Sequence, residues 1–287
     1  MRPDGQSGDT MAANHNSHYK LLFSHPELIR DLLVDFVPVV RPSTLRLDTL
    51  QRVTGSYTGD ARYEDMAWKV RLADQWLYVY LLFEFQSRSD EWIALRMHVY
   101  VSLLLRDLQR QKQVSPDGKL PPVLPIVVCN GAKAWNAATD LAELLTNAPE
   151  GLQALQPAQR HLVISAGNYP LESLNSKPNL VAALFRLEYS RTTADMERVL
   201  LSLSEWLTDP KYASLRQDFS RFASWRLRRQ EILVGEARLL HRLLEHRFGS
   251  LPTWVEARLA NAVEEDLVRW GKRVLDPTVP LEQLLSI

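Results

Sequence analysis

Three polar residues stand at the ends of two strand-like runs in the first third of the chain. Asp65 comes just before the run 67–72, Glu84 is near the end of the run 76–85, and Gln86 follows that run directly. Because side chains alternate along a strand, Glu84 and Gln86 share one face. If the two runs pair as an antiparallel hairpin, Asp65 lies at the same end as Glu84, and their carboxylates could share one hard cation such as Mg²⁺. The alternative is that Glu84 and Gln86 simply emerge into solvent where the strand ends.

Hydrophobic periodicity predicts the elements that must position these residues. In chain order they are a helix over 27–36, strands over 45–54, 67–72 and 76–85, a helix over 90–111, and strands over 123–129 and 161–165. Because strand 123–129 follows a helical crossover, we expect it to lie parallel to a neighbour. The first part of the chain is therefore predicted to be an α/β fold with a mixed central sheet flanked by helices.

The strand pattern stops after about residue 178, and only helical periodicity follows. The predicted helices cover 179–190, 193–208, 211–247 and 253–271, and Thr192 with Asp195 is typical of an N-terminal cap. We expect a disordered tail over 1–14, a main domain over 15–230 and a small helical C-terminal domain over 235–287.

The chain as a whole carries 34 basic and 34 acidic residues, but the basic ones gather in one helical stretch. Residues 211–247 contain nine bases and four acids, an excess of five positive charges. Phe219, Phe222 and Trp225 should pack inward there, which leaves Arg221, Arg228 and Arg229 able to face phosphates. The alternative is a solvated helical face with internal ion pairs.

The composition also excludes several classes of protein. A single cysteine, Cys129, excludes a disulfide framework and a cysteine-rich zinc site. The N-terminus lacks the apolar segment of a signal peptide, and the densest apolar run, 76–85, is too short to span a bilayer. We expect a soluble, cytoplasmic protein with no membrane partner. A homo-oligomer is compatible with the sequence.

Short motifs follow one another along the chain in a recognisable order. They are His15 to Lys20, Leu22 to Pro26, Gly55 to Tyr57, Arg62, Asp65, Leu81 to Ser87, Leu95, Arg96, Tyr100 and Leu120 to Pro125. This ordered set resembles the recombination-promoting nuclease (Rpn) and transposase family, which belongs to the PD-(D/E)XK nuclease superfamily. The resemblance covers about 15–165, and it continues more diffusely to about 230. The tail resembles the short helical domain of unknown function that often follows this nuclease module.

The resemblance implies a restriction-endonuclease-like core and a metal-dependent DNA endonuclease acting in recombination or transposition. Asp65 and Glu84 stand at the family's acidic positions and would hold Mg²⁺ or Mn²⁺. Gln86 stands where many superfamily members carry Lys, so it would position the attacking water by hydrogen bonds alone. Arg96 and Tyr100 are four residues apart on the following helix and share a face. They point either toward the site, where Arg96 could contact a phosphate, or away from it as a structural pair.

Three residues depart from the family pattern. Asn16 replaces an Asp of the opening motif, Gln86 replaces the Lys, and Glu64 replaces a small polar residue before Asp65. These departures motivate a second hypothesis, a catalytically degenerate nuclease fold that binds DNA or assembles complexes without cleaving. A third hypothesis is a protein-interaction scaffold that binds neither DNA nor metal.

Overall fold

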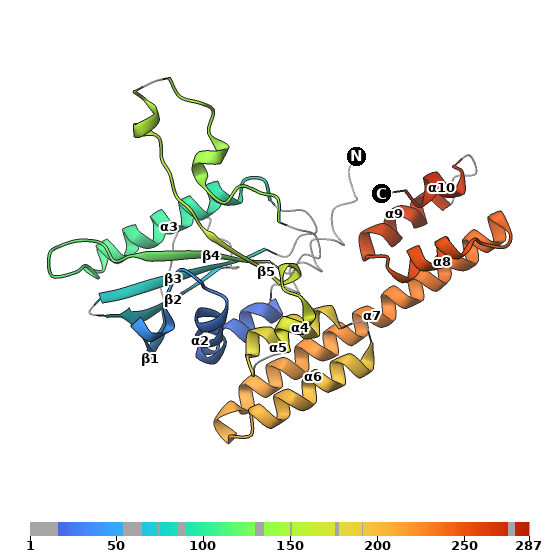
Figure 1. Cartoon of the computed structure of the whole chain (residues 1–287), viewed down its shortest axis with the longest axis horizontal. Coiled ribbons are helices and arrows are strands. Elements are labelled where there is room, and N and C mark those ends of the chain that lie inside the picture. The colour runs from blue at the N-terminus through green and yellow to red at the C-terminus, as the bar shows by residue number, and fades with distance from the viewer. Residues whose placement is uncertain are drawn as a thin grey trace.

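A five-stranded sheet is the framework of the first part of the chain in the computed structural model (Figure 1). The structure describes residues 17–53, 65–73, 75–84, 90–129, 135–149, 151–175, 178–190, 192–274 and 279–286, so the predicted tail lies outside the described residues. The strands are β1 (Leu45–Val53), β2 (Asp65–Leu72), β3 (Gln75–Glu84), β4 (Val123–Cys129) and β5 (Leu162–Ser165), and they lie side by side in this order. All five were predicted to within two residues over the part that the structure describes.

The sheet is mixed, as predicted. The pairs β1–β2 and β2–β3 are antiparallel, whereas β3–β4 and β4–β5 are parallel. Helix α3 (Ile93–Arg110) is the crossover that returns the chain to the start of β4, which explains the parallel pairing. The register of β1 against β2 is regular at Arg46 and again from Gln51, with an irregularity between them.

Two apolar clusters cover the two faces of the sheet. Trp68 and Val79 belong to a large cluster, here called the main core, that also contains apolar residues of α2 (Pro26–Asp35) and α5 (Leu180–Tyr189). Ala67 and Tyr78 directly precede Trp68 and Val79 on the same strands, so they face the other side of the sheet. They belong to a second cluster with the inner face of α3. We call the side of the sheet on which this second cluster lies the α3 face.

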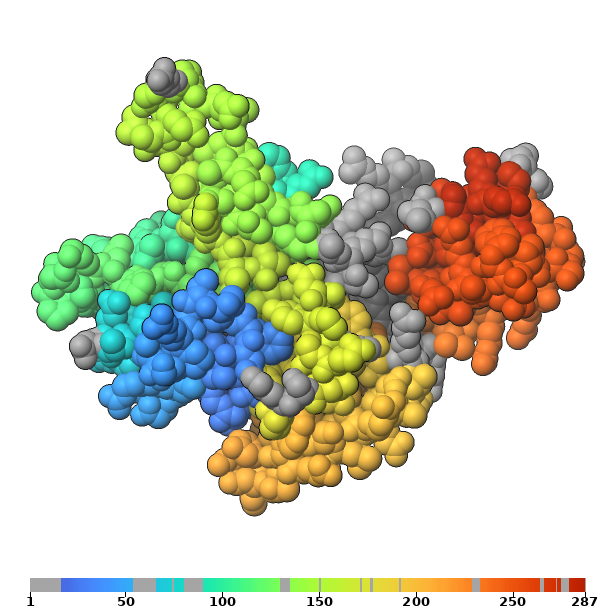
Figure 2. All heavy atoms as spheres, viewed as in Figure 1, coloured from blue at the N-terminus to red at the C-terminus, as the bar shows by residue number. Residues whose placement is uncertain are grey.

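The remaining helices follow β5 in the chain. They are α4 (Leu171–Leu174), α6 (Thr193–Trp206), α7 (Ala213–Phe248), α8 (Thr253–Ala260), α9 (Glu264–Val274) and α10 (Leu281–Leu284), and residues 17–23 are also helical. Short 3₁₀ turns occur at Pro42–Thr44, Leu141–Leu144, Gln153–Leu155, Ala166–Asn168 and Pro210–Tyr212. The segment between β4 and β5 projects from the body (Figures 1 and 2). Among the helices that the described residues form, none has both the length and the apolar character needed to span a bilayer.

The prediction of one helix over 253–271 is wrong, because the segment forms two helices. Helix α8 ends at Ala260, and α9 begins at Glu264. The Asn261 side-chain amide donates to the Ala257 carbonyl at 2.7 Å, which satisfies a carbonyl of the last turn and competes with continuation of the helix. The cap predicted at Thr192 is confirmed, since its hydroxyl accepts from the Asp195 N–H at 3.1 Å.

Helix α7 joins two apolar cores. Its first half contributes Phe219 and Phe222 to the main core, and its second half contributes Leu240 and Leu244 to a third cluster with α8, α9 and α10. The helix has 36 residues, which is about 54 Å at 1.5 Å per residue. The domain boundary expected near residue 235 therefore falls inside a continuous helix, with a separate core at each end.

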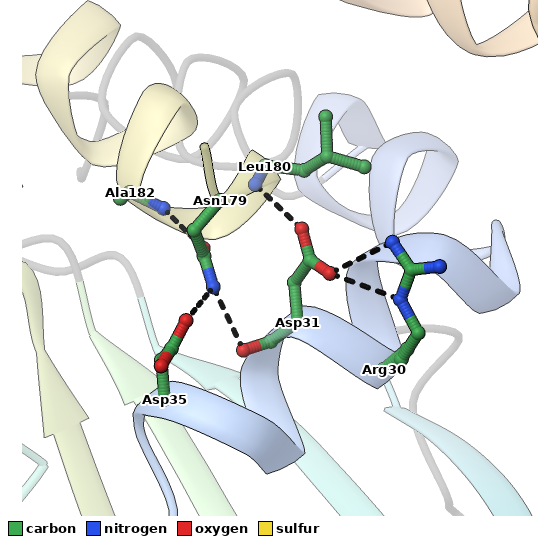
Figure 3. Close-up of polar contacts among 6 residues, drawn as sticks. All are labelled: Arg30, Asp31, Asp35, Asn179, Leu180 and Ala182. Carbon is green, nitrogen blue, oxygen red and sulfur yellow. Dashed lines mark hydrogen bonds and ion pairs between the residues drawn. The ribbon is translucent and has the colours of Figure 1, made fainter. Parts of the chain in front are cut away.

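A polar cluster around the buried residues Asp31 and Asn179 fixes α5 against α2 (Figure 3). The Asp31 carboxylate accepts from the Leu180 N–H at 2.7 Å, and the Asn179 side chain accepts from the Ala182 N–H at 2.9 Å. The Asn179 amide also donates to the Asp35 carboxylate at 2.8 Å. Two N–H groups at the start of α5 thus find acceptors on side chains, which orients this helix over the sheet.

Replacing Asp31 by Asn should stabilise the protein at neutral pH. Burial raises the pKa of Asp31, although the Leu180 N–H and Arg30 act in the opposite direction. The fold therefore favours the protonated form, and stability falls as pH rises through that raised pKa. An amide keeps an acceptor for Leu180 without the charge. We expect a higher unfolding temperature than the parent at neutral pH and a smaller difference at acid pH.

The control is Asn179→Ala, which removes an N-terminal cap and should cost about 1 kcal/mol or more at both pH values. A lower unfolding temperature for Asp31→Asn at neutral pH would show that the ion pair with Arg30 outweighs the cost of burial.

Candidate functional site

The hairpin of β2 and β3 brings the two predicted acidic positions to the same end of the sheet. Asp65 pairs with Leu82, and Glu84 lies two residues further along β3. The antiparallel pairing on which the predicted site depends is therefore confirmed. The side chains of Asp65 and Glu84, and all of Gln86, lie outside the described residues.

The same edge of the sheet receives the carboxyl ends of the parallel strands. Glu84 pairs with Cys129 at the end of β4, and Cys129 pairs with Ser165 at the end of β5. Strand ends in open α/β sheets are where ligand sites usually form, because the following loops diverge there. The register thus connects Asp65 to Ser165 across four strands.

Ser165 is a residue of this edge that the sequence analysis missed. Its side chain is 1% exposed, and its hydroxyl has no hydrogen-bond partner in the described part of the chain. Val163, two residues earlier, packs against the α3 cluster, so Ser165 also lies on the α3 face. A serine closing a parallel strand was a weak signal for this position, because many strands end in a small polar residue.

Buried polar groups support the edge from the main-core side. Burial, together with Glu188 and Cys129 nearby, raises the pKa of Tyr189 at the end of α5. The Tyr19 hydroxyl donates to the Glu188 carboxylate at 3.4 Å, and Arg226 of α7 donates to the Glu188 carbonyl. The two hydrogen bonds connect residues 17–23, α5 and α7 within the main core.

Arg96 pairs with an acid near the start of α3. Its guanidinium donates to the Asp90 carboxylate at 2.7 Å, and the two side chains are 27% and 23% exposed. Tyr100, one turn later, is buried in the α3 cluster. Arg96 thus has an acidic partner that the sequence analysis did not name, and its contact with phosphate stays a prediction.

The basic stretch of α7 is oriented as predicted where the structure describes it. Phe219 and Phe222 are buried and Trp225 packs against them, whereas Arg228 is exposed. Arg221 is half exposed, and it forms an ion pair with Asp218 at 3.1 Å. The Arg229 side chain lies outside the described residues. The apolar side of this stretch belongs to the main core, on the opposite side of the sheet from the α3 face.

The described residues contain no group of three or more His, Cys, Asp or Glu side chains that could hold a metal ion. This finding leaves the pair Asp65 and Glu84 untested, because neither side chain is described. The described side chains therefore do not form a zinc site.

The comparisons with known proteins identify the family. A profile described as "Putative transposase, YhgA-like" matches residues 13–216, and the chain belongs to this family. The recombination-promoting nuclease RpnD of Escherichia coli O157:H7 is 26% identical over 129 residues, which are 44% of this chain and 48% of RpnD. The recombination-promoting nuclease RpnA of Escherichia coli K12 is 28% identical over 124 residues, 42% of this chain and 41% of RpnA.

Not every relative has a name that implies activity. The inactive recombination-promoting nuclease-like protein RpnE of Escherichia coli K12 is 27% identical over 125 residues, 42% of this chain and 40% of RpnE. The chain spans less than half the length of these three relatives. No solved structure matches the chain, so the mixed α/β sheet is established and the restriction-endonuclease-like fold stays a prediction.

Replacing Ser165 by Ala should leave the fold intact and raise the free energy of unfolding by about 1 kcal/mol, because a buried hydroxyl without a partner is costly. Ser190→Ala is the matched control. The Ser190 hydroxyl is also on a buried residue but donates to the Arg186 carbonyl at 2.8 Å, so its loss should be destabilising. Urea titration measures both. A destabilised Ser165→Ala protein would mean that the hydroxyl has a partner outside the described residues.

Proposed function

We propose that this protein is a divalent-metal-dependent DNA endonuclease, with Asp65 and Glu84 as the metal ligands and Gln86 positioning the water. The observation that carries the proposal is the register, which puts both acidic positions at the same end of β2 and β3. Strand alternation supports it further. Ala67 and Tyr78 belong to the α3 cluster. Position 65 is two residues from Ala67 and position 84 is six residues from Tyr78, so alternation puts both acidic positions on the α3 face.

The residue types at this edge fit a hard cation. Carboxylate oxygens are the ligands that Mg²⁺ and Mn²⁺ prefer, and the Ser165 hydroxyl adds a buried oxygen on the same face. When bound, the cation supplies charge neutralisation for the phosphate and lowers the pKa of a coordinated water.

Gln86 stands at the position where the resemblance implies Lys in many members of the superfamily. A neutral amide can donate and accept hydrogen bonds, but it adds no positive charge near the phosphate. Its proposed role is to orient the water for attack on phosphorus. The phosphate charge must then be balanced by the metal and by basic residues around the site.

The names of the relatives support a role in recombination or transposition, which we propose for this chain as well. The second candidate is a nuclease fold that binds DNA or assembles complexes without cleavage. Gln86, Asn16 and the existence of a relative named inactive favour it. The two candidates differ in turnover rather than in fold.

Purified protein should nick supercoiled plasmid DNA with Mg²⁺ or Mn²⁺ and lose this activity in EDTA. Asp65→Ala and Glu84→Ala should each slow nicking by about 100-fold or more, because metal assistance is worth several kcal/mol of barrier. Asp48→Ala is the matched control, since it removes an exposed acid from the same sheet. Variants that nick as fast as the parent would refute the site.

The second candidate is separated from the first by calorimetric titration with metal. An active site should bind Mg²⁺ or Mn²⁺, and both alanine variants should abolish that binding. DNA binding with neither metal binding nor nicking would favour the non-cleaving module.

The α7 arginines are proposed to hold DNA by its phosphates. Substituting Arg221, Arg228 and Arg229 together by Gln should weaken binding of all DNA sequences and lower the salt slope, because fewer counterions are released. The ion pair of Arg221 with Asp218 predicts a decrease of about two units rather than three. Metal binding should not change. An unaltered slope would assign these residues to solvation of the helix.

A further inference from the structure

The hydroxyl of Ser165 differs in its surroundings from those of two other serines of the chain. The Ser190 and Ser202 hydroxyls each donate to a main-chain carbonyl four residues earlier, at 2.8 and 3.0 Å. Both serines follow a turn of helix, which brings that carbonyl within reach. Ser165 ends a strand, where main-chain carbonyls point along the sheet and side chains point away from it. No atom of the described residues is hydrogen-bonded to its hydroxyl.

Burial makes this hydroxyl costly for the fold. Ser165 is 1% exposed, so bulk water does not replace the missing partner. A buried hydroxyl without a hydrogen bond destabilises the folded protein, and in native proteins such a group often has a catalytic role or meets a bound ion or water. Natural proteins depart from full hydrogen bonding mainly at functional sites. The place of Ser165 at the strand end of the candidate site therefore calls for a functional explanation.

One row of positions across the sheet connects Ser165 to an acidic position of that site. Ser165 pairs with Cys129, and Cys129 pairs with Glu84. Cys129 follows Val127 of the α3 cluster by two residues, so all three positions lie on the α3 face. In the described sheet β5 is an outer strand, so Ser165 has strand neighbours only on the β4 side. Along the sheet, the row therefore leads from Ser165 toward Glu84.

The width of this row suits one hydrogen bond between its two ends. Neighbouring strands are about 4.8 Å apart, so the backbones at Ser165 and Glu84 are separated by roughly 9.6 Å. Carbon–carbon bonds of about 1.5 Å each carry a glutamate carboxylate well away from its backbone. A hydrogen bond between two oxygens adds about 2.7 Å. The side chain at Cys129, between the two positions, is short, so a longer side chain can reach across it.

Glu84 is also the best hydrogen-bond acceptor in the row. A carboxylate forms shorter and stronger hydrogen bonds with a hydroxyl than a neutral acceptor does, whereas the thiol of Cys129 is a weak acceptor. Carboxylates that bind a metal are commonly held by a hydrogen bond from a neighbouring residue, which fixes their orientation toward the ion. Ser165 offers a donor of this kind.

We propose that Ser165 is a positioning residue of the metal site, whose hydroxyl donates a hydrogen bond to the Glu84 carboxylate and orients it toward the cation. The inference rests on the proposed function, which assigns Glu84 as a ligand. A hydroxyl kept for this contact destabilises the protein in the absence of the cation and strengthens binding of the cation. Its removal should therefore move stability and metal affinity in opposite directions, which a purely structural residue does not do.

The test combines calorimetric titration with Mn²⁺ and thermal unfolding in EDTA, so no readout depends on DNA cleavage. Ser165→Ala should bind Mn²⁺ about 10- to 100-fold more weakly than the parent, while its unfolding temperature in EDTA is higher. Ser190→Ala is the matched control, and it should keep the parental affinity and unfold at a lower temperature. Ser165→Thr retains the hydroxyl on a residue type that suits a strand, so it should retain the affinity that Ser165→Ala loses.

Parental Mn²⁺ affinity in Ser165→Ala would overturn the inference, and so would weaker binding together with a lower unfolding temperature, which indicates general damage to the sheet. If Glu84→Ala abolishes Mn²⁺ binding while Ser165→Ala leaves it unchanged, the proposed metal site stands and only the role of Ser165 is refuted. A parent that binds no Mn²⁺, or a Glu84→Ala variant that binds it as the parent does, would refute the proposed metal site and the inference with it.

Discussion

The double pairing of β3 is the constraint on which the rest of the structure depends. This strand is antiparallel to β2 on one side and parallel to β4 on the other, so its register fixes both neighbours. Val79 packs in the main core and Tyr78 in the α3 cluster. A slip by one residue would exchange these two environments and bury the wrong side chains. The same register sets Glu84 against Cys129 and near Asp65, so the candidate site follows from the packing of the strand.

The sequence was sufficient for the elements whose pattern is local. Hydrophobic periodicity predicted a strand over 76–85, and a helical crossover predicted that β4 would be parallel. The break between α8 and α9 could not be predicted, because periodicity continues through it and one hydrogen bond from Asn261 decides the end. The pairing register of the strands places Ser165 at the same end of the sheet as Glu84, and it places Arg71 opposite Trp76. Alternation within one strand does not contain that information.

The sequence of α7 predicted which side chains face the core and which face outward, but it did not predict which arginines already have partners within the protein. The aromatic residues turn inward as their spacing requires, but several of the arginines already have partners. Arg221 pairs with Asp218 one turn earlier, and Arg226 donates to the carbonyl of Glu188, 38 residues away. A contact of the second kind depends on how α5 packs against α7, which the spacing of charges does not reveal. In the same way, the sheet places Lys69 and Arg71 of β2 against the Trp76 ring of β3, which charge counting does not reveal.

The irregular register of β1 has a consequence for the solution behaviour of the protein. An outer strand offers unpaired backbone groups to any other strand, and aggregation often begins there. In β1 the pairing shifts between Arg46 and Gln51, and charged residues punctuate the strand. At the opposite margin, β5 is only four residues long. Both edge strands of the sheet therefore disfavour pairing with a strand of a second copy, which protects the fold against growth into fibrils.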